Sequence, residues 1–195
     1  MDARFLMDHP RDRMIAAAID GMRASGLAGA GINQVIAASG APKGSLYHYF
    51  PGGKLALAQE ALEHFGAQRQ AELKAALSGD APVDQKIKRL FSRMAKGLAQ
   101  ENFRFGCAVA GVSLDLGEEA SALAPVCAAL MESWTSTIAD ALEPLPAARR
   151  RALARFVVTA FEGALVQARA SRSAHPVLEA GDQLAVLLRA HLNAL

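Results

Sequence analysis

Apolar residues recur along most of the chain at the three- and four-residue spacing that puts them on one face of an α-helix. Between residues 10 and 25, one such face consists of Ile15, Ala18, Ile19 and Met22. Stretches that alternate apolar and polar residues, as half-buried strands do, are rare. The pattern therefore predicts an all-α fold.

Glycine, proline and serine clusters divide this pattern into about nine helices. We expect helices at residues 10–25, 32–38, 42–50, 54–77, 83–100, 108–114, 118–142, 147–172 and 176–195. No low-complexity linker interrupts the chain, so the junction between two domains is expected inside the helix that begins at Lys54. The predicted domains are 1–55, three helices with a helix-turn-helix, and 56–195, a helical bundle.

The composition supports a helical fold but does not identify a binding partner. Hydrophobic residues make up 52% of the chain but aromatic residues only 6%, and a net charge of +2 does not by itself indicate a polyanionic partner. The stretch from Gly21 to Gln59, however, contains no acidic residue. That stretch would not repel phosphate.

Residues 32–50 have the features of a helix-turn-helix, two short helices joined by a tight turn. Gly40 stands where the first helix ends and is expected to have a positive φ, which glycine adopts without steric cost. Pro42 suits the first turn of the following helix. Leu46, Tyr49 and Phe50 are expected to face the core.

The remaining residues of the second helix form its outer face, where small and polar side chains allow close approach to bases and phosphates. The N-terminus of the helix near Lys54 offers backbone N–H groups to a phosphate. With two positions of the first helix, the predicted DNA contacts are Asn33, Gln34, Pro42, Lys43, Gly44, Ser45, Tyr47, His48 and Lys54.

The segment from Gly31 to Lys54 resembles the DNA-binding motif of the TetR family, and its run from Gly40 to Lys54 is most similar to the LmrA/YxaF-type branch. The resemblance implies a TetR-like fold and DNA contacts from Lys43, Ser45, Tyr47, His48 and Lys54. One departure is that Ala30-Gly31 replaces the usual Ser/Thr cap of the first motif helix. Asn33 and Gln34 also replace the commoner Arg/Asp pair.

Bulky groups on several helices of the C-terminal region are candidates for an apolar ligand cavity, although each by itself fits an ordinary core. They are Phe91, Met94, Phe103, Phe105, Cys107, Met131, Trp134 and Phe161. The last two helices carry broad apolar faces that could cover their own domain or pack on a second copy. The family resemblance favours dimerisation through Phe156, Ala160, Ala164, Leu184, Leu188 and His191.

The implied function is a ligand-responsive regulator, a homodimeric repressor released from a palindromic operator in double-stranded DNA by a small apolar effector. The alternative is a helical small-molecule-binding protein that no longer reads specific DNA. No nucleophile elbow or metal-ligand spacing supports an enzyme, a metal site or a cofactor, and Cys107 and Cys127 fit buried, inert thiols. With neither a signal peptide nor a spanning segment, the expected location is the cytoplasm, without a membrane partner.

Overall fold

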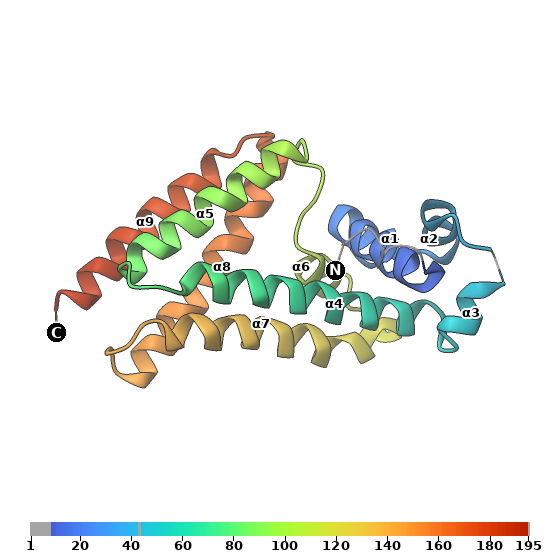
Figure 1. Ribbon diagram of the computed structural model, residues 1–195, viewed down its shortest axis with the longest axis horizontal. Coiled ribbons are helices and arrows are strands. Elements are labelled where there is room, and N and C mark those ends of the chain that lie inside the picture. Colours follow the sequence, from blue (N-terminus) through green and yellow to red (C-terminus); the bar gives the residue numbers. More distant parts are fainter. Residues whose placement is uncertain (1–8, 43, 195) are drawn as a thin grey trace. The chain divides into compact units, whose positions relative to one another are not determined.

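The computed structural model describes residues 9–42 and 44–194, and over this part of the chain it contains nine α-helices and two 3₁₀ helices. In chain order they are α1 (Pro10–Ser25), η2 (Gly26–Ala30), α2 (Ile32–Ser39), α3 (Ser45–Tyr49), α4 (Gly53–Leu77), α5 (Val83–Gln100), α6 (Ala108–Leu114), η3 (Glu118–Leu123), α7 (Ala124–Asp140), α8 (Ala147–Ser171) and α9 (His175–Leu192). The described residues include no β-strand, so the predicted all-α class is confirmed (Figure 1).

Some of the expected elements differ from the structure. The single helix expected over 118–142 is divided into η3 and α7, because Pro125 stands at the second position of α7 and lacks the N–H that a continuing helix would need. The glycine-rich stretch after α1, for which no helix was expected, forms the 3₁₀ helix η2. The bounds of α5 and α6 agree with the prediction.

The chain forms two compact units. The first contains residues 1–67 and 107–130, and the second contains residues 68–106 and 131–195. Both α4 and α7 begin in the first unit and end in the second. Along the described chain, no helix combines the length and the apolar character needed to cross a lipid bilayer.

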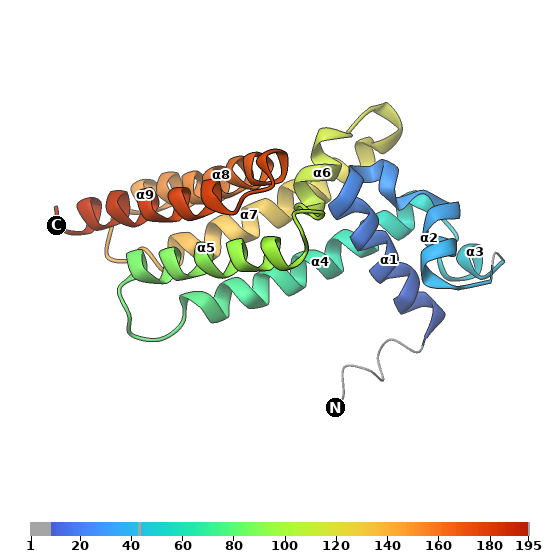
Figure 2. The same ribbon diagram turned by 90° about the horizontal axis from the view of Figure 1, so that it is seen from above.

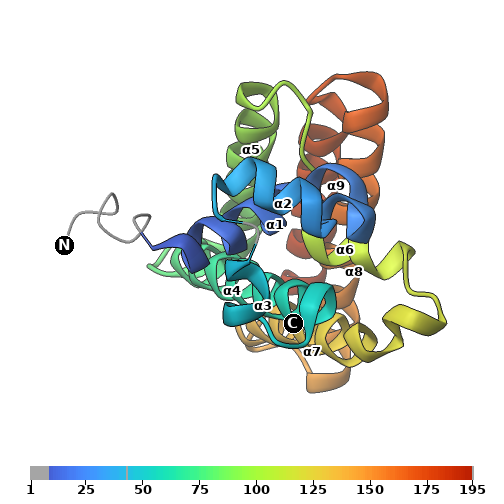
Figure 3. The same ribbon diagram turned by 90° about the vertical axis from the view of Figure 1, so that its right-hand side faces the viewer.

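In the first unit, α1 is the central helix and contacts η2, α2, α3 and α6. Met14, Ile15, Ala18 and Met22 of α1 are buried, whereas Ile19, expected on the same face, is only half-buried. The buried face is thus shifted by part of a turn, toward Met14. Figure 3 shows α1, α2 and α6 beside one another, the arrangement that surrounds this face.

In the second unit, α9 lies alongside both α5 and α8 (Figures 1 and 2). Phe91 of α5 is at the centre of this packing. A Cβ atom at Gly181 of α9 would lie only 2.6 Å from the Phe91 Cβ, and the Phe161 ring of α8 meets the Phe91 ring edge to face at 5.7 Å. Small and aromatic residues are therefore paired across these helices.

An ion pair also joins α5 to α9. The buried Asp84 carboxylate, in the first turn of α5, accepts hydrogen bonds from Arg189 Nε at 2.9 Å and Nη2 at 2.7 Å. The Arg189 side chain is itself exposed. Because a buried carboxylate without partners is costly, the pair is expected to hold the two helices in register.

We expect Arg189→Ala to lower the free energy of unfolding by about 2 kcal/mol, because it leaves the buried carboxylate unpaired. The matched control is Lys88→Ala, which removes an exposed ion pair between Lys88 and Asp182, 2.8 Å long, that joins the same helices. The control should cost less than about 0.5 kcal/mol. Urea unfolding measures both, and equal losses would contradict this assignment.

Candidate nucleic-acid interface

The turn between α2 and α3 has the backbone geometry expected from its glycine. Gly40 adopts φ 63° and ψ 19°, the left-handed conformation that residues with a Cβ rarely adopt. Before it, the buried Ser39 hydroxyl donates to the Ile36 carbonyl at 3.3 Å and accepts the Ala41 N–H at 3.4 Å. The turn is thereby defined both by backbone conformation and by a buried side chain.

Both ends of α2 are held by side chains from outside the turn. At its C-terminus, Arg13 Nε of α1 donates to the Ser39 carbonyl at 2.9 Å, where the helix dipole favours a cation. At its N-terminus, Gly31 provides no side-chain cap. Instead the Gln34 amide, oriented so that donor meets acceptor, donates to the carbonyls of Ala28 at 3.0 Å and Gly29 at 3.3 Å.

Helix α3 is shorter than the helix expected from the sequence. The prediction of a helix from Pro42 is wrong, since α3 begins at Ser45. The Pro42 carbonyl accepts the Ser45 N–H at 3.0 Å and the Ser45 hydroxyl at 2.6 Å, which closes a turn before the helix. Pro42 and Gly44 are therefore exposed residues of that turn, and Lys43 lies outside the described residues.

The two faces of α3 are well separated in exposure. Leu46 and the following Phe50 are buried, and the half-buried Tyr49 ring meets the His9 ring edge-on at 5.2 Å. On the opposite face the Tyr47 side chain is 59% exposed, with His48 exposed beside it. The helix thus has its apolar side chains inward and a phenol and an imidazole outward.

The other predicted contacts flank this face in the sequence. Asn33 and Gln34 are exposed on α2, although the Gln34 amide already has two carbonyl partners. Lys54, in the first turn of α4, is half-buried. Among the described residues between Gly21 and Gln59 none carries a carboxylate. Such a surface can donate hydrogen bonds to phosphate without charge repulsion.

The predicted ligand-binding residues are not gathered in one unit. Cys107 belongs to the first unit, and the other members of the set belong to the second. Phe91 and Phe161 contact each other, while Met94, Phe103, Phe105 and Met131 are half-buried. Trp134 is buried, and its Nε1–H has no hydrogen-bond partner within the described part of the chain. An effector with an acceptor atom could use this donor.

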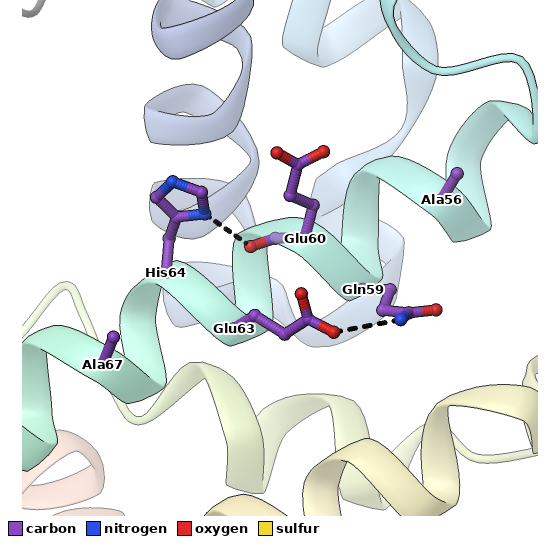
Figure 4. Close-up of a pocket in the computed structure, with 6 residues that line it drawn as sticks. All are labelled: Ala56, Gln59, Glu60, Glu63, His64 and Ala67. Atoms are coloured by element: carbon purple, nitrogen blue, oxygen red, sulfur yellow. Dashed lines mark hydrogen bonds between the residues drawn. The ribbon is translucent and has the colours of Figure 1, made fainter.

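Two hollows of the described structure lie away from these residues. A hollow of about 530 Å³ is lined by Ala56, Gln59, Glu60, Glu63, His64 and Ala67, all on α4 (Figure 4). Its polar groups are engaged, since Gln59 donates to Glu63 at 3.0 Å and Glu60 pairs with Arg11. A second, lined by basic and polar residues of α5, is similar in volume. Neither includes a predicted ligand-binding residue.

Three of the predicted dimerisation residues are buried within the chain itself. Leu184, Leu188 and Ala164 have almost no exposed surface and so cannot contact a partner without rearrangement. Ala160 and His191 are half-buried, and Phe156 is 51% exposed. The exposed large hydrophobic residues in the described part of α8 and α9 are Phe156, Val166, Leu178 and Val186. The pattern of apolar positions did not distinguish the inward from the outward side of these helices.

Both cysteines are buried in the first unit. Burial raises the pKa of the Cys127 thiol, although a hydrogen bond with Ser113 opposes the shift. A raised pKa leaves less thiolate at neutral pH, and the thiolate is the reactive form.

Known proteins match the chain over its N-terminal and its C-terminal region. Residues 14–61 match the family model of bacterial regulatory proteins, tetR family, and residues 82–183 match that of the LmrA/YxaF-like C-terminal domain. The HTH-type transcriptional regulator Rv0196 of Mycobacterium tuberculosis is 34% identical over 95% of this chain and 97% of its own. LmrA of Bacillus subtilis, an HTH-type transcriptional regulator, is 30% identical over 92% of this chain and 96% of its own.

Solved structures share the fold at lower identity. The regulatory protein TetR from Rhodobacter sphaeroides superposes with a TM-score of 0.79 at 24% identity, over 89% of this chain and 95% of that one. A cysteine mutant of CifR complexed with 26-bp double-strand operator DNA superposes with a TM-score of 0.76 at 21% identity, over 88% of this chain and 93% of that one.

Two glycines of the motif provide a matched pair of variants. Gly40→Ala should lower the free energy of unfolding by about 1 kcal/mol, because φ is +63° and no neighbouring atom lies within 4 Å, so backbone strain is the whole cost. Gly44→Ala, with φ −73° and equally open surroundings, should be neutral or stabilise by up to about 1 kcal/mol. Thermal unfolding tests the pair; equal effects would refute the left-handed turn.

Proposed function

The chain belongs to the TetR family of transcriptional regulators, with its C-terminal region of the LmrA/YxaF-like type, and we propose that it is a repressor released from a palindromic operator by a small apolar effector. Members of this family are regulators rather than enzymes, and they bind operator DNA as dimers. The observation that carries the proposal is the α3 helix, with Leu46 buried and Tyr47 and His48 exposed.

Some of the proposed DNA contacts would reach base edges, and others would bind the phosphate backbone. Tyr47, His48 and Ser45 of α3, with Gly44 before it, would approach base edges and phosphates in the major groove. Lys43 and Asn33 are proposed as further contacts, together with Pro42 at the turn. Lys54 and the backbone N–H groups at the start of α4 would bind a phosphate.

The proposed functional division is a DNA reader, 1–55, and a sensor and dimerisation region, 56–195. α4 is the proposed connection, because it begins at Gly53 within the reader and continues to Leu77 without a break. The effector would act by preferring a conformation whose recognition helices no longer fit successive major grooves. Moving the protein from mostly bound to mostly free requires a preference of roughly 5.5 kcal/mol.

The proposed effector site uses the aromatic groups of the second unit. The Phe91 and Phe161 rings provide an apolar surface, and Trp134 Nε1–H provides a donor for a polar atom of the ligand. We assign the cytoplasm as the place of action, where a bacterial operator is accessible.

Selection of bound duplexes from a random DNA pool tests the proposal. At about 150 mM salt, where nonspecific binding is weakened, we expect enrichment of an inverted repeat whose half-sites are about 34 Å apart. Tyr47→Phe should then bind the selected duplex roughly fivefold more weakly, because a phosphate hydrogen bond is lost. Tyr49→Phe, which removes a hydroxyl from the inward side of the same helix, is the control.

Absence of any enriched sequence, with a folded dimer free of co-purified ligand, would contradict the repressor and favour a helical small-molecule carrier. Equal binding by the two phenylalanine variants would show instead that α3 does not present Tyr47 to DNA.

The dimer is proposed to form through the exposed apolar residues of α8 and α9. Val186→Glu, at a position 64% exposed, should halve the mass measured by light scattering while leaving the helical circular-dichroism signal intact. Leu188→Glu should instead reduce the yield of folded protein, since it buries a charge. Leu114→Glu, at an even more exposed apolar position in the first unit, should remain dimeric; an unchanged mass for Val186→Glu would refute this interface.

A further inference from the structure

A carboxylate distant in sequence caps the turn that precedes the DNA-reading helices. Asp115 follows α6, and its Oδ2 accepts the backbone N–H of Leu27 at 2.7 Å. Leu27 belongs to the first turn of η2, where backbone N–H groups have no partner within the helix. The bond is charge-assisted and therefore stronger than one between neutral groups.

The surroundings of this bond leave little space for another arrangement. Gly26 adopts φ 61° and ψ −155°, a region that glycine almost alone occupies, and a Cβ there would collide with Asp115 Oδ2. A Cβ at Gly111 of α6 would lie 3.0 Å from the Met22 carbonyl of α1. The backbones of α1, η2 and α6 therefore lie close together, and the Asp115 side chain, although exposed, places its Oδ2 against Gly26 and Leu27.

The same turn supports α2. η2 presents the carbonyls of Ala28 and Gly29 to the Gln34 amide, while Gly31 provides no side-chain cap for the helix. A set of contacts thus runs from Asp115 through Leu27 and η2 to Gln34, which lies on α2. Through these contacts the side chain of Gln34, in the first turn of α2, is bonded to the backbone of η2.

We propose that Asp115 is a positioning residue for operator binding, which holds η2 and through it sets the start of α2. The inference rests on the proposed function as a DNA-binding regulator. Asp115 lies in the region matching the LmrA/YxaF-like C-terminal domain, outside the 14–61 match to the tetR model. A residue outside the DNA-reading segment therefore determines how that segment is presented.

The test compares variants of the full-length protein on the duplex obtained by selection. Asp115→Ala should weaken operator binding roughly tenfold, the order expected for loss of a charge-assisted hydrogen bond. Asp115→Asn keeps an acceptor oxygen and should restore binding to within about threefold of the parent. Glu119→Ala removes an exposed carboxylate close in sequence and is the control.

Two further measurements separate positioning from general destabilisation. Hydrogen exchange of the Leu27 amide should accelerate in Asp115→Ala and not in Glu119→Ala. In a double-mutant cycle, Asp115→Ala and Gln34→Ala should be non-additive, because both act through η2. Additive losses of binding free energy would indicate that Gln34 contacts DNA independently of Asp115. They would overturn the proposed link from Asp115 through η2 to Gln34.

Failure of the positioning role and failure of the proposed function give different results in these experiments. Parental binding by Asp115→Ala, or equal losses in the alanine and asparagine variants, would refute the positioning role. If Asp115→Ala fails to fold, Asp115→Asn and the exchange rate of its Leu27 amide provide the test. Protection of that amide and operator binding that both equal those of the parent protein would support the positioning role. Weakened operator binding although the Leu27 amide stays protected would refute it. Failure of the parent protein itself to select any duplex would refute the proposed function instead.

Discussion

The close approach of backbones between α1 and η2 determines where the rest of the first unit can lie. A side chain at Gly21 would collide with the Gly29 carbonyl, and one at Gly29 would collide with that of Gly21. Because no side chain separates the two segments, η2 has almost no freedom to slide along α1. The start of α2 follows directly from η2, and the Gly40 turn then sets the direction of α3.

The conformation of α3, the candidate DNA-binding helix, depends on its packing more than on its own helical stability. α3 consists of residues Ser45–Tyr49 only, and a helix of this length is not stable in isolation. Its conformation is supported by burial of Leu46 and Phe50 and by the Pro42 carbonyl, which closes the preceding turn. Tyr47 and His48 are thereby presented outward without stabilising the helix themselves.

The second unit is packed differently, because aromatic residues of one helix lie against small or aromatic residues of the neighbouring helices. Gly181 allows α9 to approach Phe91, and Phe161 completes the contact from α8. This packing uses residues that the sequence had marked as ligand-binding candidates. Core packing and ligand binding require the same apolar side chains, so their identity alone does not separate the two roles.

Local rules were enough to predict most of the helices and the left-handed Gly40, because periodicity, glycine and proline act over a few neighbouring residues. The family was predicted from the resemblance of the segment from Gly31 to Lys54. Local rules did not predict that α3 begins at Ser45. They also did not predict that Leu184 and Leu188 face inward, because an apolar helix face can be covered either by the same chain or by a second copy. Nor could they pair Asp115 with Leu27, which are 88 residues apart. Only the tertiary structure decided these contacts, because they require segments distant in sequence to meet.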